Sequence, residues 1–197
     1  MRIHKFVKMI ISVIIPLLMQ IGVVNSVAAT PHESVTEFMD GLRAGDETVM
    51  EKYLDNPYIN LLMNVSGDRE VTDRMYAALF ENFSYEIVEI LEKNQVAVAE
   101  VEVSGSDFSG VMEAYSAASY EYVTDNLYSD SIEDKEALSA RCLEIYVEQI
   151  EAAASSGAGF EAVVYVPMTD DGLFGWNILA TDEMMSLILG NLEVPEL

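Results

Sequence analysis

The residues of this chain that could do chemistry are carboxylates, tyrosines and one cysteine. With 34 acidic residues in 197, carboxylates fall close together by chance, so no pair of them by itself indicates acid–base catalysis. A serine triad needs a histidine at the site, and the two histidines, His4 and His32, both lie near the start of the chain. The sequence therefore identifies no catalytic residue.

The usual motifs of metal and phosphate sites are also missing from the sequence. There is no His-Glu-x-x-His motif, no Cys/His cluster for zinc and no glycine-rich phosphate loop. The Asp-containing residues 130–134 and 170–172 do not follow the calcium-loop pattern and are typical of a helix cap and a turn. We expect neither a metal ion nor a cofactor.

The aromatic residues are the candidates for binding. Tyr115 and Tyr122 lie in a predicted helix that also carries Tyr120, and Trp176 is the single tryptophan. Core packing is the more common reason for such side chains, and the alternative is an aromatic-lined groove for a peptide, lipid or sugar. Tyr115, Tyr122 and Trp176 are therefore the candidate lining residues of a pocket or groove.

Cys142 is the only cysteine, which excludes an intramolecular disulfide. It shares a predicted helical face with Leu138 and Ile145 and has no histidine or cationic cluster beside it in sequence. A thiol in such surroundings behaves as a small apolar residue. We expect Cys142 to be buried and unreactive.

The first thirty residues have the layout of a secretory signal. Three basic residues come first, an apolar run covers residues 9–24, and small residues up to Ala29 supply a cleavage site. We predict that residues 1–29 are a signal peptide cleaved after Ala29, with Ala28 as the alternative, and that the protein is secreted or extracytoplasmic. The other interpretation is an N-terminal membrane anchor, but the run contains Pro16 and is shorter than the about 20 apolar residues that span a bilayer.

Removal of the signal leaves a strongly acidic chain. From Thr30 onward it has 7 basic and 34 acidic residues, a net charge of −27. Such a surface repels nucleic-acid phosphates and anionic lipid head groups and favours solubility. The expected partner is an unknown small molecule, a peptide or a cell-envelope component, with no nucleic acid, and with membrane contact only through an uncleaved signal segment.

Helices are predicted first, from hydrophobic residues three and four positions apart. A capping box formed by Ser34 and Glu37 begins the first helix. Asp46 caps the second, and Asn56 with Pro57 ends it. A third helix follows before the strands.

Residues 83–91 have the composition of a strand and residues 95–103 alternate in polarity, so the two segments predict a β-hairpin. Ala97, Ala99, Val101 and Val103 are predicted to face the core, while Glu100 and Glu102 face solvent.

Residues 160–168 and 174–178 predict a second hairpin, joined by an Asp-Gly turn. This pairing places Trp176 in the core of the sheet, in register with Val164 and Val166.

Between the two hairpins, residues about 107–154 are predicted to form two helices joined by a short link, a helical hairpin. The chain from residue 30 to 197 shows no repeat and no low-complexity linker, so we predict a single α+β domain that carries this insertion.

Three stretches, taken in order, resemble a known family. They are residues 35–46, residues 95–103 with Asp107 and Phe108, and residues 174–178 with Leu189 and Gly190. They are similar to the small exported proteins of Gram-positive bacteria whose domains of unknown function belong to the nuclear-transport-factor-2-like (cystatin-like) group. The resemblance implies a curved antiparallel sheet packed on the N-terminal helices, forming a cone with a pocket. Relatives are often lipoproteins, whereas this chain has Thr30 where their lipid-bearing cysteine would stand.

The same fold also hosts ketosteroid isomerases and dehydratases, which use an acid or base inside the cone, and none of their motifs is present here. We therefore expect an exported, non-catalytic binding or interaction module. The alternative is a small enzyme of the isomerase or dehydratase kind that uses a carboxylate inside the cone pocket, since fold alone does not decide function. A carboxylate in a closed apolar pocket would favour the enzyme, and a solid core would favour the binding module.

The cleavage site gives the first testable prediction. Intact mass spectrometry of the exported protein should give the mass of a chain that begins at Thr30, because small residues precede that position. Recovery of the full-length chain in the membrane fraction would show instead that the segment is an anchor.

Overall fold

The computed structural model describes residues 29–64, 69–170, 172 and 175–195. Within this part, β1 (Ser84–Lys93), β2 (Val96–Ser106), β3 (Gly159–Asp170) and β4 (Trp176–Ile178) form an antiparallel sheet in the order β1-β2-β3-β4. The helices are α2 (Pro31–Ala44), α3 (Glu47–Met50), η1 (Glu51–Tyr53), α4 (Pro57–Asn64), α5 (Arg69–Phe80), α6 (Val111–Asp125), α7 (Asp130–Glu133), α8 (Lys135–Ser155) and α9 (Asp182–Ile188). The predicted α+β class and both predicted hairpins are confirmed.

The signal-peptide prediction falls on residues 1–28, which lie outside the described residues. In the part of the chain that the structure describes, no helix is both long and apolar enough to cross a bilayer.

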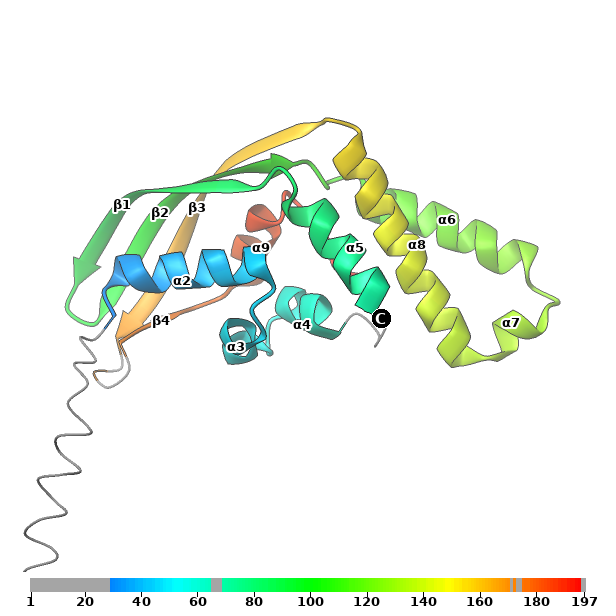
Figure 1. Ribbon diagram of the computed structural model, residues 1–197, viewed down its shortest axis with the longest axis horizontal. Coiled ribbons are helices and arrows are strands. Elements are labelled where there is room, and N and C mark those ends of the chain that lie inside the picture. Colours follow the sequence, from blue (N-terminus) through cyan, green and yellow to red (C-terminus); the bar gives the residue numbers. More distant parts are fainter. Residues whose placement is uncertain (1–28, 65–68, 171, 173–174, 196–197) are drawn as a thin grey trace, which may run out of the picture.

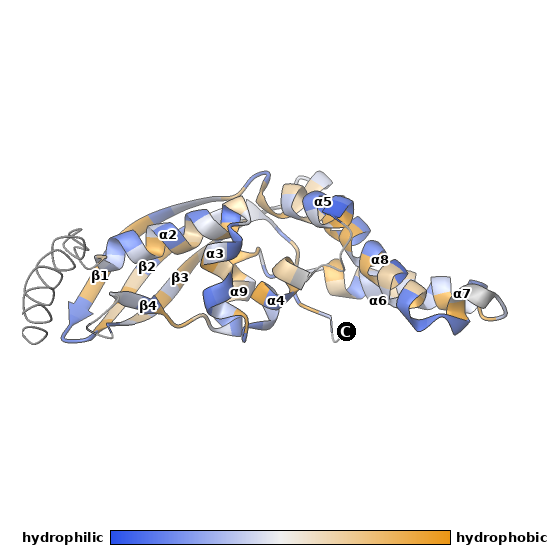
Figure 2. Cartoon of the chain, turned by 60° about the horizontal axis from the view of Figure 1, so that its bottom comes forward, coloured by the Kyte–Doolittle hydropathy of each residue, from blue (hydrophilic) through white to orange (hydrophobic). Residues whose placement is uncertain are grey.

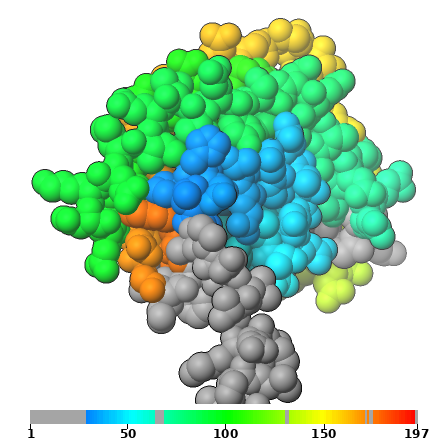
Figure 3. All heavy atoms as spheres, turned by 60° about the vertical axis from the view of Figure 1, so that its left-hand side comes forward, coloured from blue at the N-terminus to red at the C-terminus, as the bar shows by residue number. Residues whose placement is uncertain are grey.

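The core lies between the inner face of the sheet and the helices, and the sheet curves over α2 and α9 (Figure 1). On β2 the inward residues Ala97, Ala99 and Val101 are almost completely buried, as their alternation predicts. In the space-filling view, α2 lies between the strands and the helices α3 and α4 (Figure 3). Its buried side chains are Val35, Phe38, Met39 and Leu42.

The start of α2 differs from the prediction. Thr30 and Glu33 form the capping box: the Thr30 hydroxyl accepts from the backbone N–H of Glu33 (3.2 Å), and the Glu33 carboxylate accepts from the backbone N–H of Thr30 (2.8 Å). Ser34 is buried within the helix. Pro31 favours the earlier start, because the first helical position needs no N–H donor.

Asn56 begins a helix rather than ending one. Its side-chain oxygen accepts from the backbone N–H of Tyr58 (3.0 Å), which caps α4. Its amide nitrogen donates to the carbonyl of Ala180 (3.2 Å) and to a carboxylate oxygen of Asp182 (3.0 Å). One buried amide with all its contacts satisfied thus ties the start of α4 to the start of α9.

The predicted pairing of the strand that carries Trp176 with Val164 and Val166 is wrong. β4 pairs with the last residues of β3, so that Trp176 lies opposite Asp170 and Ile178 opposite Met168. Trp176 is half-buried at the rim of the core, while Ile178 is buried. The connection between the paired ends is longer than a two-residue turn, and this moves the pairing away from Val164 and Val166.

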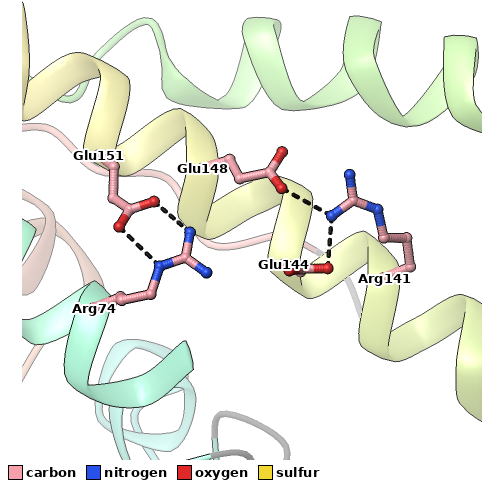
Figure 4. Close-up of polar contacts among 5 residues, drawn as sticks. All are labelled: Arg74, Arg141, Glu144, Glu148 and Glu151. Atoms are coloured by element: carbon pink, nitrogen blue, oxygen red, sulfur yellow. Dashed lines mark hydrogen bonds and ion pairs between the residues drawn. The ribbon is translucent and has the colours of Figure 1, made fainter. Parts of the chain in front are cut away.

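Helices α6, α7 and α8 lie between β2 and β3 in the chain and extend away from the sheet as an arm, in both views (Figures 1 and 2). Arg74 of α5 donates to both carboxylate oxygens of Glu151 on α8 (Figure 4). These hydrogen bonds lower the pKa of Glu151. Their contribution to stability is therefore present at neutral pH and is lost as the pH falls through that lowered pKa.

On the outer part of α8, Arg141 contacts Glu144 (2.6 Å) and Glu148 (2.8 Å) (Figure 4). Its guanidinium also lies over the ring of Tyr122 on α6. The side chain of Arg141 thus contacts both α6 and α8.

The buried face of α8 agrees only in part with the prediction. Asp134 caps α8, its carboxylate accepting from the backbone N–H of Glu136 (3.0 Å). Ile145 is buried, as predicted, together with Leu143, Tyr146, Val147 and Ile150. Cys142 lies beside that face and is half-buried, so its predicted full burial is wrong.

Gly190 gives a sharp test of the packing between β2 and the end of α9. Its φ is +61°, and a Cβ there would overlap the carbonyl oxygen of Ser106. We expect Gly190→Ala to lower the free energy of unfolding by about 2–5 kcal/mol, from left-handed strain and overpacking together. Chemical denaturation measures this.

Gly110→Ala is the matched control, because a Cβ at Gly110 meets nothing within 4 Å. Its effect should stay within about 0.5 kcal/mol. Equal stability of the two variants would contradict the described contact.

Candidate functional site

The outward face of β1, β2 and β3, called here the open face, carries large apolar side chains in contact with solvent. A two-layer fold normally has polar residues on this side of its sheet. Here Leu91 is 65% exposed and Tyr165 61%. Other exposed apolar residues on these strands are Val88, Val96 and Val163.

A one-residue β-bulge in β1 decides which side chains reach the open face. Ile87 pairs with Val101 and Glu89 with Glu100, so that Val88 is the extra residue. Val88 and Glu89 are both exposed, while Ile87 and Ile90 on either side pack against the core. Bulges re-aim side chains in this way, and this one turns Glu89 outward.

Four carboxylates meet on the open face as a result. Glu86 lies directly opposite Glu102, and Glu89 directly opposite Glu100. Opposed residues are about 5 Å apart between Cβ atoms, and successive outward residues on a strand are about 6.7 Å apart. We call Glu86, Glu89, Glu100 and Glu102 the glutamate square.

The glutamate square has no cationic partner among the described residues, where the ion pairs involve other acids. Like charges placed directly opposite each other destabilise a sheet. These four side chains therefore weaken the fold rather than support it.

Apolar side chains border the glutamate square on two sides. On β3, Val163 pairs with Glu102 and Tyr165 with Glu100. In the next row toward the β1–β2 turn, Leu91 pairs with Val98. Together these place aliphatic and aromatic contact area beside a compact negative charge.

A hollow of about 600 Å³ adjoins the glutamate square. Its polar lining comes from Ser84, Glu86, Glu102, Ser104 and Glu161. Another, of about 430 Å³, lies at the β1–β2 hairpin and is lined in part by Leu91, Val96 and Val98. The open face can thus hold an extended ligand along its strands, with charge at one end and apolar contact at the other.

A third hollow, of about 960 Å³, lies between the end of α2, α4 and α5. Its lining includes Arg43 and Arg69 together with acids, so its charges are of both signs. Tyr76 lines it and donates its hydroxyl hydrogen to the sulfur of Met50 (3.1 Å). Burial raises the pKa of Tyr76, which makes it a poorer proton donor.

The predicted aromatic residues are not brought together. Tyr115 packs edge-to-face on Tyr146, with ring centroids 5.4 Å apart, and Tyr122 lies under Arg141. Both contacts are between α6 and α8. Trp176 is on β4, at the opposite end of the molecule (Figure 1), and none of the three lines the hollows described above.

The chemistry available on the open face is electrostatic and apolar binding. Within the described residues, no group of three or more His, Cys, Asp or Glu side chains is arranged to hold a metal ion. Of the square, the sequence placed Glu100 and Glu102 correctly on the outward face of the sheet, where Glu102 is exposed and Glu100 half-buried, but it gave no sign that the β1 acids lie beside them. Val163 and Tyr165 were the available signal, because they are apolar at outward positions of a half-buried strand.

The glutamate square predicts a measurable cost to stability. Glu89→Lys replaces repulsion with attraction toward Glu100, so we expect the free energy of unfolding to rise by about 0.5–1 kcal/mol at low salt and the gain to shrink at high salt. Thermal or urea unfolding at two salt concentrations measures it.

The control is Glu121→Lys, at an exposed position on α6 with the same change of net charge. An equal gain in both variants would mean that the whole-protein charge, not the square, is responsible.

No family model matches the chain, and no curated protein matches it. A solved structure of ycdA from Bacillus subtilis, described as a candidate lipoprotein, is 17% identical, with a TM-score of 0.39. The likeness covers 82% of this chain and 46% of that one, so this chain spans just under half of that protein's length. Such a TM-score is too low to assign a common fold.

Proposed function

We propose that this protein is an exported, non-catalytic binding module that holds its partner on the open face of the sheet. The observation that carries the proposal is that exposed apolar side chains lie beside four glutamates on a sheet face that, among the described residues, has neither a cationic partner nor a covering layer. Exposed apolar patches rimmed by polar residues are typical of interaction surfaces. Residues that lower stability without packing or pairing are expected where a surface is used for binding.

The proposal includes the compartment, the family and the domain organisation. Export rests on the signal-like residues 1–29. Membership of the nuclear-transport-factor-2-like group and a cone-like shape are supported by a sheet that curves over α2 and α9. A single domain over residues 30–197 is supported by one contiguous core, in which α6 and α8 join the helices and strands.

The enzymatic alternative requires a carboxylate inside the cone. Among the described residues, the buried polar side chains are those of Ser34, Asn56 and Ser106, and Asn56 is held by its own hydrogen bonds. The space between sheet and helices is filled by large side chains such as Phe38 and Met185. This packing favours a binding module over a pocket enzyme.

The test uses two matched double variants. Leu91→Ser/Tyr165→Ser removes apolar area from the open face, and Leu54→Ser/Tyr128→Ser removes the same residue types elsewhere; all four side chains are exposed, so both variants should fold. The probes are fluorescein-labelled seven-residue peptides in a basic, a neutral and an acidic series, each with two valines. We expect at least one series to bind the wild type and to bind the open-face variant about tenfold more weakly, because aromatic and aliphatic contacts carry much of such affinity.

Fluorescence anisotropy gives the affinities, and circular dichroism checks the fold. Unchanged affinity in the open-face variant, equal losses in both variants, or no binding by any series would contradict the proposed surface.

A further inference from the structure

We infer that the partner is an extended, basic polypeptide segment whose alternate side chains place two Lys or Arg residues over the glutamate square and apolar residues over Leu91 and Val98. This inference rests on the proposed function and names the class of partner. It is based on the negative charge of the glutamate square, the distance between successive rows of side chains, and the residues that border the square.

Charge complementarity selects a basic partner. Four carboxylates within one square, with no cationic partner in the described part of the chain, favour side chains that bring positive charge to them. Tyr165, 61% exposed and adjacent to Glu100 in the sheet, offers an aromatic face on which a guanidinium or ammonium can lie. A second copy of this chain would bring acids against acids, so self-association is disfavoured.

The spacing selects an extended backbone. The outward residues Glu102, Glu100 and Val98 alternate along β2. Rows on the open face therefore follow each other about every 6.7 Å along that strand, which is the distance between alternate residues of any strand. A segment lying along β1 and β2 therefore meets Glu86 and Glu102 with one side chain, Glu89 and Glu100 with the next, and the Leu91–Val98 row with a third.

The border fixes where the charges of the partner can lie. Lys93 pairs with Val96 in the row beyond Leu91, so a basic side chain there would face a like charge. The partner's basic residues are thus excluded from the Lys93 end of the open face, and apolar residues lie there instead. A polyamine or an amino sugar polymer would match the charge but would leave the apolar rows without contacts.

The experiment measures binding of one labelled peptide by fluorescence anisotropy at low salt. The peptide carries lysines at its first and third positions, valines at its fifth and seventh, and serines between. A permuted peptide of the same composition breaks the alternation. Glu89→Gln/Glu102→Gln is compared with the charge-matched Glu113→Gln/Glu121→Gln on α6, where both residues are exposed.

We expect the alternating peptide to bind the wild type more tightly than the permuted one. We expect Glu89→Gln/Glu102→Gln to weaken that binding about fivefold to tenfold, as the loss of two exposed charge contacts implies, while the α6 variant keeps wild-type affinity. Equal affinity for the two peptides, or equal losses in the two variants, would overturn the inference and indicate attraction to net charge alone.

Other outcomes separate the inference from the proposed function. Binding of the neutral series of peptides in place of the basic one, with loss in Leu91→Ser/Tyr165→Ser, would overturn the basic partner and leave the open face as a binding surface. A wild-type dimer in sedimentation equilibrium that Leu91→Ser/Tyr165→Ser dissociates would assign the face to a second copy and overturn the inference. Absence of binding by every series would contradict both.

Discussion

In β1, Val88 and Glu89 together face Glu100 of β2, and this extra residue determines what each side of the sheet presents. Without it, strict alternation would send Ile90 outward with Val88 and turn Glu89 toward the core. With it, Ile87 and Ile90 both pack against the core, and Glu89 joins the other three glutamates. Core packing and the candidate site thus depend on the same local irregularity.

The rest of the fold leaves that face open and holds it steady. Helices α2 and α9 fill the concave side of the sheet, where Met39, Val101 and Met185 are fully buried. Asn56 ties α4 to α9, and Arg74 ties α5 to the arm through Glu151. These contacts all lie away from the open face. A well-packed fold with an exposed sheet face suits binding, because a preorganised surface needs little ordering when a partner docks.

Much of the sheet could be predicted from the sequence, because alternation in β2 and β3 is regular and strongly apolar on one side. The inward alanines and valines, and Glu100 and Glu102 on the other face, follow from it. The bulge in β1 could not be predicted from the sequence, since β1 has no glycine at the irregular position. Ile87 and Ile90, three residues apart in a strand, were the only sign that alternation breaks there.

Local signals with two meanings account for the other differences. An Asn-Pro pair can end a helix or begin one. At Asn56, hydrogen bonds to Ala180 and Asp182, which are distant in sequence, favour the beginning of a helix. Two possible capping boxes, Thr30 with Glu33 and Ser34 with Glu37, occur within eight residues, and Pro31 favours the one that begins at Thr30. The candidate site was missed because it consists of pairs across strands: Glu86 and Glu102 become neighbours only through the register.

Binding at the open face can be tested by a two-dimensional amide spectrum of the wild-type protein, recorded during titration with the alternating lysine–valine peptide. We expect shifts in the backbone amides of residues 86–91, 98–102 and 163–167, with those of α6 and α8 unchanged. Shifts confined to α6 and α8, or to the residues around the hollow beside α5, would contradict binding at the open face.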